Sequence, residues 1–283
     1  MTCAWKELQA VLPIWMRKEI DMPEEALCEI RLRINSPPEL ISAGKSRWLE
    51  RNISREDLQY TVNAASRYSP WAAATSAHGY ITAEGGHRIG LCGEVVIHNG
   101  NITGISKITS LCIRVAGDFP GIAAGLEKLS GSILIIGAPG WGKTTLLRDL
   151  IRQRSQKEKI CVVDERGELF PMKMEWGKCV DVLSGCEKKK GIPMLLRTMG
   201  PDTIAVDEIT EPEDVRALIH SANCGVKLLA TAHAASVTDL RNRSIYRPLL
   251  DNHLFDALVI LNRNNTYAVE RMTRWDSDGL VQF

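Results

Sequence analysis

Eight residues of this sequence have the types and spacing of a phosphate-binding loop. Residues 137–144 read Gly-Ala-Pro-Gly-Trp-Gly-Lys-Thr, which matches G-x-x-x-x-G-K-[ST] at every fixed position. Gly140 and Gly142 let the backbone approach a phosphate, and Lys143 would place its charge on the β- and γ-phosphates. The Thr144 hydroxyl would hold Mg²⁺. The predicted nucleotide-binding residues are Gly137, Ala138, Pro139, Gly140, Trp141, Gly142, Lys143, Thr144 and Thr145.

The residues on either side of this loop predict the elements that would position it. Residues 133–136 (Ile-Leu-Ile-Ile) are apolar and mostly β-branched, which is typical of a buried parallel strand. Residues 144–150 have a composition compatible with a helix. A strand, a glycine-rich turn and a helix N-terminus direct backbone N–H groups and the helix dipole at an anion. The sequence therefore predicts a phosphate site for a nucleotide with Mg²⁺, and we expect the nucleotide to be ATP.

A second segment offers the carboxylates that hydrolysis requires. Residues 203–208 (Thr-Ile-Ala-Val-Asp-Glu) predict a buried strand that ends in two acids. Asp207 would orient the Mg²⁺ shell, and Glu208 would hold the attacking water. Because ligands of parallel α/β sheets bind at the carboxyl ends of the strands, we favour this interpretation over two solvated acids.

Two further strand ends carry candidate groups. Residues 160–168 end in acids, of which Glu165 and Glu168 are candidates for a second carboxylate set near the metal or water; surface charges are the alternative. Thr231-Ala232-His233 follows another apolar run, and His233 would donate a hydrogen bond to the γ-phosphate. A purely structural histidine is the alternative there.

The phosphoryl transition state also favours an additional cation. The residues alone leave four candidates open: Arg88, Arg114, Arg166 and Arg197. The run Lys188-Lys189-Lys190 is interpreted as a solvated loop, with contact to a phosphate or an acidic partner as the alternative.

Composition bounds the class of protein. The chain has 283 residues, a formal net charge of +1 and 45% hydrophobic residues, as expected for a two-domain globular protein without a global attraction to nucleic acid. Its eight cysteines include no C-x-x-C pair, which favours reduced thiols in the cytoplasm. No apolar run reaches about 20 residues, and the first residues lack the pattern of a signal peptide. We therefore expect a cytoplasmic protein that reaches a membrane only through a partner.

The pattern along the chain divides it into two parts. Residues 1–125 predict a smaller α+β domain, and residues 126–283 alternate between strands and helices, as in an α/β domain with a parallel sheet. A helix is expected to begin at Pro212 and to end at Gly225. The predicted strands of the second part are 132–136, 159–164, 203–207, 226–231 and 256–261.

In this order, the four motif segments resemble the secretion ATPases of type II, type IV pilus and type IV secretion systems. The resemblance rests on residues 137–144, 196–202 (Leu-Arg-Thr-Met-Gly-Pro-Asp), 206–209 (Val-Asp-Glu-Ile) and 229–233 (Leu-Ala-Thr-Ala-His). The N-terminal segments Glu-Ile-Arg-Leu-Arg and Gly-His-Arg-Ile-Gly-Leu-Cys-Gly-Glu are similar to a sporulation branch of that superfamily.

This resemblance implies a RecA-like ATPase domain that works as a homohexameric ring. It implies that arginines of the N-terminal domain reach the phosphates, which favours Arg88 or Arg114. It also implies membrane-embedded sporulation channel components as partners on the cytoplasmic face, at the channel between mother cell and forespore. The chain departs from the usual pattern, with Asp207-Glu208 in place of Gly-Glu and Thr210-Glu211 in place of Arg-Asp.

The sequence-based hypothesis is thus an Mg²⁺-dependent ATPase that energises assembly or operation of such a channel. A nucleotide-gated ring scaffold with little hydrolysis is a second hypothesis, and the presence of Glu208 argues against it. A RecA-like nucleic-acid motor is a third, but the near-neutral charge and the lack of a mixed aromatic and basic stretch argue against it.

Overall fold

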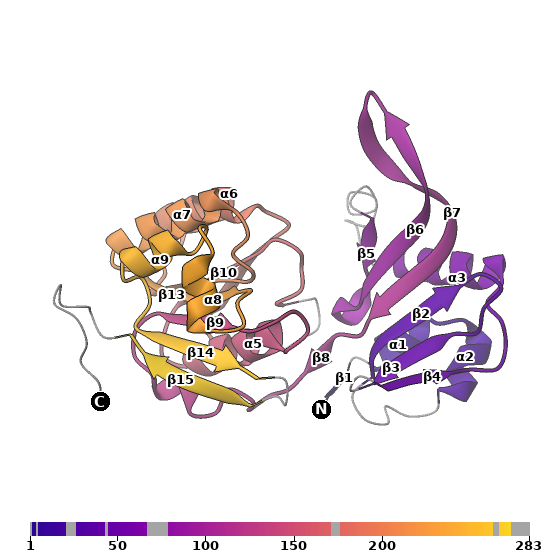
Figure 1. Ribbon diagram of the computed structural model, residues 1–283, viewed down its shortest axis with the longest axis horizontal. Coiled ribbons are helices and arrows are strands. Elements are labelled where there is room, and N and C mark those ends of the chain that lie inside the picture. Colours follow the sequence, from indigo (N-terminus) through magenta and orange to yellow (C-terminus); the bar gives the residue numbers. More distant parts are fainter. Residues whose placement is uncertain are drawn as a thin grey trace. The chain divides into compact units, whose positions relative to one another are not determined.

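The structure is a computed structural model that describes residues 2–3, 5–20, 27–42, 45–66, 79–170, 176–262 and 266–272. The chain forms two compact units, which meet in sequence at Phe119 and Pro120. Figure 1 shows a mainly antiparallel first unit and a second unit with a central sheet between helices. Each unit is described by itself.

The first unit is built on a six-stranded antiparallel sheet of order β4-β3-β2-β7-β6-β5. Its core gathers apolar side chains from the sheet and from three helices, with α3 in contact with β7. The strands β1 (Thr2–Cys3) and β8 (Gly117–Asp118) form a separate antiparallel pair. The other elements are α1 (Trp5–Val11), α2 (Ile14–Glu19), β2 (Leu27–Arg33), β3 (Glu39–Ser42), β4 (Lys45–Trp48), α3 (Arg55–Ser66), β5 (Tyr80–Thr82), β6 (Arg88–His98) and β7 (Asn101–Arg114).

The second unit contains a seven-stranded sheet of order β11-β10-β12-β13-β9-β14-β15. All neighbours are parallel except β14 and β15, so the expected parallel α/β sheet is confirmed. The five predicted strands are present, while β11 and β15 were not predicted. The strands are β9 (Ile133–Ile136), β10 (Ile160–Asp164), β11 (Val180–Ser184), β12 (Thr203–Val206), β13 (Lys227–Ala232), β14 (Ala257–Leu261) and β15 (Tyr267–Arg271).

Alternation along the strands creates two separate cores around this sheet. Leu134 and Ile136 belong to the core under four helices, α6 (Lys188–Thr198), α7 (Pro212–Asn223), α8 (Val237–Asn242) and α9 (Arg247–Asp251). Ile133 and Ile135 point the other way, into the core formed with α5 (Lys143–Arg154). Successive side chains of a strand face opposite sides, so a continuous apolar strand such as β9 is covered on both faces.

Two local expectations have different outcomes. The predicted helix after Pro212 is confirmed as α7, which begins with a reciprocal capping box between Glu211 and Asp214. The interpretation of Lys188-Lys189-Lys190 as a solvated loop is wrong, because these residues form the first turn of α6. Lys188 is buried and pairs with Glu165, which is the kind of partner that a buried ammonium group requires.

Candidate nucleotide-binding site

The loop 137–142 connects β9 to α5 in a conformation that depends on glycine. Gly140 and Gly142 have φ angles of +78° and +88°, in the left-handed region that residues with a Cβ rarely adopt. An added Cβ at either position would meet no atom within 4 Å, so backbone strain, not crowding, selects glycine. The loop thereby brings the N-terminus of α5 to the carboxyl edge of the sheet, beside β13 and β14.

Lys143, the first residue of α5, is buried at the centre of the site. Its ammonium group donates to the carbonyl oxygens of Gly137 and Ala138, both at 2.9 Å, and lies 3.0 Å from Nδ1 of His233. Burial lowers the pKa of Lys143, opposed by the negative charges of Asp207 and Glu208. The loop thus holds a buried lysine whose positive charge is only partly balanced by the carboxylates of Asp207 and Glu208.

A chain of hydroxyl and carboxylate groups joins three strand ends. Thr144 Oγ1 donates to Asp207 Oδ2 at 2.7 Å, and Thr231 Oγ1 donates to Asp207 Oδ1 at 2.5 Å. Thr231 Oγ1 also accepts the backbone N–H of Glu208 at 2.8 Å. The sequence reasoning assigned no role to Thr231, although its place two residues before His233 puts both side chains on the same side of β13.

Glu208 follows β12 and has a φ angle of +52°, which is strained for a residue with a side chain. Its carboxylate is held on both oxygens, at 2.6 Å from His233 Nε2 and at 2.5 Å from an Arg166 nitrogen. Burial raises the pKa of Glu208, but the charge of Arg166 and the hydrogen bond from His233 outweigh burial, so its pKa lies below the usual value. Glu208 is therefore ionised at neutral pH.

The two contacts of His233 define its tautomer. The ammonium group of Lys143 can only donate, so Nδ1 is the acceptor in that pair. The carboxylate of Glu208 can only accept, so Nε2 carries the proton and donates. A neutral ring satisfies both contacts, and His233 thereby connects the loop lysine to the acid at the end of β12.

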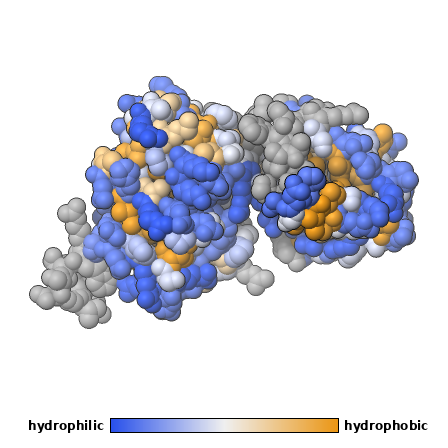
Figure 2. Space-filling model, turned by 90° about the horizontal axis from the view of Figure 1, so that it is seen from above, coloured by the Kyte–Doolittle hydropathy of each residue, from blue (hydrophilic) through white to orange (hydrophobic). Residues whose placement is uncertain are grey.

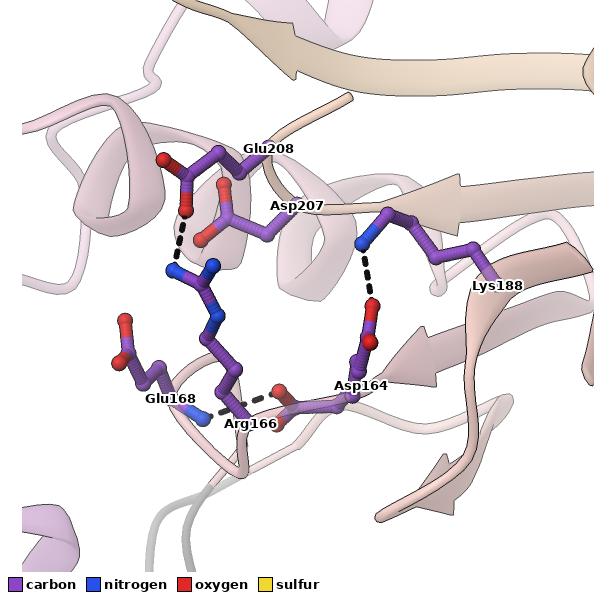
Figure 3. Close-up of a pocket in the computed structure, with 7 residues that line it drawn as sticks. Asp164, Arg166, Glu168, Lys188, Asp207 and Glu208 are labelled. Atoms are coloured by element: carbon purple, nitrogen blue, oxygen red, sulfur yellow. Dashed lines mark hydrogen bonds and ion pairs between the residues drawn. The ribbon is translucent and has the colours of Figure 1, made fainter. Parts of the chain in front are cut away.

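A small acidic cavity of about 20 Å³ adjoins this network, large enough for one water molecule (Figure 3). On one wall Lys188 Nζ donates to Glu165 at 2.5 Å. On another, Asp164 accepts the backbone N–H groups of Glu168, Leu169 and Phe170. Burial raises the pKa of Asp164, while these N–H groups oppose the rise. The cavity is lined by Asp164, Glu165, Arg166, Glu168, Lys188, Asp207 and Glu208.

The arginines proposed from the sequence lie in different places. Arg166 contacts Glu208 within the site. Arg88 and Arg114 belong to the first unit, where they are directly opposed on β6 and β7, and Arg88 stacks on the ring of Tyr80. Arg197 lies in the last turn of α6, near the amino end of β12. The roles of Arg88 and Arg114 stay predictions.

The fold places the protein in a known class. It is similar to the structure of the ATPase DotB of Legionella pneumophila, with a TM-score of 0.58 and 17% identity over 88% of this chain and 76% of that one. A structure of the pilus retraction motor PilT with bound ADP has a TM-score of 0.58 and 15% identity, over 87% of this chain and 76% of that one. The second unit therefore has the fold of the secretion ATPases, as expected.

The chain belongs to the family described as Sporulation stage III, protein AA, which matches residues 6–273. Stage III sporulation protein AA of Bacillus subtilis (strain 168) is 36% identical over 278 residues, which is 91% of each chain. Protein SEEDLING PLASTID DEVELOPMENT 1 of Arabidopsis thaliana is 26% identical over 249 residues, with 81% of this chain and 34% of that protein covered. The sporulation branch expected from the N-terminal segments is confirmed.

Proposed function

We propose that this protein is an Mg²⁺-dependent ATPase whose second unit binds and hydrolyses ATP. The observation that carries the proposal is one connected network: Lys143, His233 and Glu208 in one branch, and Thr144, Asp207 and Thr231 in the other. These groups come from the loop, from the end of β12 and from the end of β13. They converge where a triphosphate would lie on the N-terminus of α5.

The donor set fits a nucleotide with Mg²⁺. Thr144 and Asp207 present two oxygens to one point, and Mg²⁺ prefers a few protein oxygens completed by phosphates and waters. Among the residues that the structure describes, no group of three or more His, Cys, Asp or Glu could hold a metal alone. The metal would therefore enter with the nucleotide and neutralise charge on the phosphates.

Glu208 is the residue that would orient the attacking water. A lowered pKa makes a carboxylate a weak base, so Glu208 is better suited to hold a water by hydrogen bonding than to remove its proton early. The one-water cavity next to Glu208 supports this role. Lys143 would exchange its two carbonyl contacts for phosphate oxygens, and His233 would follow the γ-phosphate.

The finer part of the proposal concerns the assembly. The chain would act as a homohexameric ring that energises assembly or operation of a sporulation channel, with membrane-embedded partners at the cytoplasmic face. Family membership and the secretion-ATPase fold support it. Arg88 or Arg114 of a neighbouring copy would supply the additional cation. No helix in the described part of the chain is long and apolar enough to cross a membrane.

The decisive variant is Glu208→Gln, which keeps the shape of the side chain and removes its charge. We expect nucleotide affinity to stay within about threefold of wild type and single-turnover phosphate release to fall by about 10²-fold or more. Glu213→Gln is the matched control, because Glu213 is a partly exposed acid on α7, outside the network, and pairs with Arg216. It should leave both quantities unchanged.

The same assay separates the alternatives. Wild-type turnover in Glu208→Gln would remove the assigned role of this residue. Tight ATP binding without phosphate release by the assembled wild-type protein would favour the ring scaffold. Absence of adenine nucleotide binding with excess Mg²⁺ would refute the proposal.

A further inference from the structure

In the described part of the first unit, several exposed apolar side chains gather at the end of the β6–β7 hairpin, residues 94–106, called the arm here. In Figure 1 the arm extends beyond the rest of the sheet. Its strands pair only with each other within the described ranges, because β5 pairs with residues 88–90 and β2 with residues 110–114. Both edges of the arm therefore present backbone groups that no other described strand pairs, and an isolated hairpin of this kind is marginally stable in water.

The strand register gives the arm one apolar face. Val95 is opposite Ile105 and Ile97 is opposite Ile102, and directly opposed residues share a face. A bulge at Thr103 shifts the register between these two pairs, so Ile102 lies on the same face as Ile105. Val96 points to the other face. The apolar face consists of Val95, Ile97, Ile102 and Ile105.

This face is exposed and carries no charge. Val95, Ile97 and Ile102 are 54%, 63% and 53% exposed, and Ile105 continues the face down to the core of the unit. Residues 95–106 contain no Asp, Glu, Lys or Arg. Figure 2 looks onto the side to which the arm points and shows an apolar patch surrounded by hydrophilic residues. A lipid bilayer is an unsuitable partner, because open strand edges do not enter the hydrocarbon region.

A complementary surface exists on the second unit of the same chain. A groove of about 510 Å³ lies between α6, α7 and the start of β13, and is called the α6–α7 groove. Met194 and Met199, both exposed, are on α6 and directly after it, and methionine adapts well to apolar partners. The groove is lined by Pro193, Leu196, Arg197, Pro201, His220 and Cys224, among others.

The polar groups of the groove also suit the arm. Arg197 and His220 are exposed, and neither side chain has a hydrogen bond or ion pair to any residue in the described ranges. Both can donate to backbone carbonyls, which the open edges of the arm supply. The groove lies at the amino ends of β12 and β13, at the opposite sheet edge from Asp207, so its occupation leaves the nucleotide site free.

We propose that the arm of one copy of this chain binds the α6–α7 groove of a second copy. The net charge of +1 gives no long-range repulsion between copies, and the uncharged apolar face of the arm fits a mainly apolar groove. Because the two surfaces differ, the contact is heterologous and joins copies head to tail, as a closed ring requires. The proposal thus deepens the ring assembly suggested above and does not depend on hydrolysis.

The first test compares the two faces of the arm. Ile97→Thr with Ile102→Thr should weaken self-association about tenfold or more in sedimentation velocity, with ATP and Mg²⁺ present. Val96→Thr is the matched control on the opposite face and should change association less than threefold. The proposal would be overturned if the double variant and Val96→Thr weakened self-association equally, or if neither weakened it. It would also be overturned if the wild-type protein stayed monomeric at all concentrations. Nucleotide binding by each variant, measured separately, reports on the proposed function alone.

The second test locates the contact. Cys224 lines the groove and is exposed, so a thiol introduced as Ile102→Cys should cross-link to it between copies under a short bis-maleimide. The cross-linked dimer should disappear in Ile102→Cys with Cys224→Ser, and peptide mapping should identify the 102–224 pair. If the thiol at position 102 cross-linked only to residues outside the α6–α7 groove, or only to another protein added to the mixture, the proposed partner would be wrong.

Discussion

Thr231 provides the sharpest test of the network, because its single hydroxyl serves both acids of the site. The side chain is fully buried, donates to Asp207 and accepts from the Glu208 backbone. Thr231→Val has nearly the same shape and removes both bonds. Asp207 would lose a charge-assisted bond worth about 1.5–3 kcal/mol, and the Glu208 N–H would lose one worth about 0.5–1.5 kcal/mol. The free energy of unfolding of the second unit should fall by about 2–4.5 kcal/mol.

Thr231→Ser is the control, because it keeps the hydroxyl and removes one buried methyl group. Thr231→Ser should lower the free energy of unfolding of the second unit by about 1 kcal/mol. Native-state hydrogen exchange of the β12 and β13 amides measures the second unit without assuming that both units unfold together. In catalysis, Thr231→Val should raise the Mg²⁺ concentration for half-maximal turnover and lower turnover, whereas Thr231→Ser should preserve both.

If Thr231→Val and Thr231→Ser are equally stable within about 0.5 kcal/mol, the hydroxyl does not hold the two acids and the reasoning fails. Equal stability of the two variants would be informative, because the Glu208 backbone has a strained φ angle of +52° that needs a contact to hold it. Such a conformation costs about 1–3 kcal/mol and persists only when neighbouring groups enforce it. In the described residues, Thr231 is the side chain that bonds this N–H.

Three further predictions concern titration, reactivity and packing. The pKa of Glu208 is lower in the folded protein than in the unfolded chain, where it is about 4.3, so its ionised carboxylate stabilises the fold fully above pH 4.3. This stabilisation is lost as the pH falls through the folded pKa. In urea titrations below about pH 4.3, the free energy of unfolding should therefore fall less steeply for Glu208→Gln than for the wild-type protein. Burial raises the pKa of Cys161 to about 11, so mass spectrometry after brief alkylation of the native protein at pH 8 should find Cys224 modified and Cys161 intact. A Cβ at Gly191 would lie 2.9 Å from Val163, so Gly191→Ala should cost about 1–3 kcal/mol in denaturant unfolding; a neutral result would contradict the packing of α6 on β10.

The features that could be predicted from the sequence are those that depend on short, contiguous patterns. The loop 137–144 is contiguous, and the apolar runs before it and before Asp207 predict buried parallel strands in any context. The burial of Lys188 was missed because its partners, Glu165 and Asp214, come from other parts of the chain. A run of three lysines gives no sign of which one turns inward.

The edge strands and the Glu208 backbone were missed for a related reason. β11 is only partly buried and β15 is mostly exposed, so neither carries the continuous apolar run by which a central strand is found. The left-handed φ of Glu208 has no sequence signal, because glycine or asparagine would be expected there. The hydrogen bond from the Glu208 N–H to Thr231 Oγ1 joins the ends of β12 and β13, and it depends on the register of these two strands in the fold.

In the proposed function, the two contacts of His233 would link nucleotide binding to the contacts of Glu208. Its ring accepts from Lys143 through Nδ1 and donates to Glu208 through Nε2, so one orientation of the imidazole holds both groups. A triphosphate that draws Lys143 onto its oxygens would remove the donor at Nδ1 and free the ring to turn toward the γ-phosphate. Glu208 would then keep only Arg166 as a partner and gain an oxygen for water. In the proposed function, arrival of the γ-phosphate would thereby free one oxygen of Glu208 to hold the attacking water.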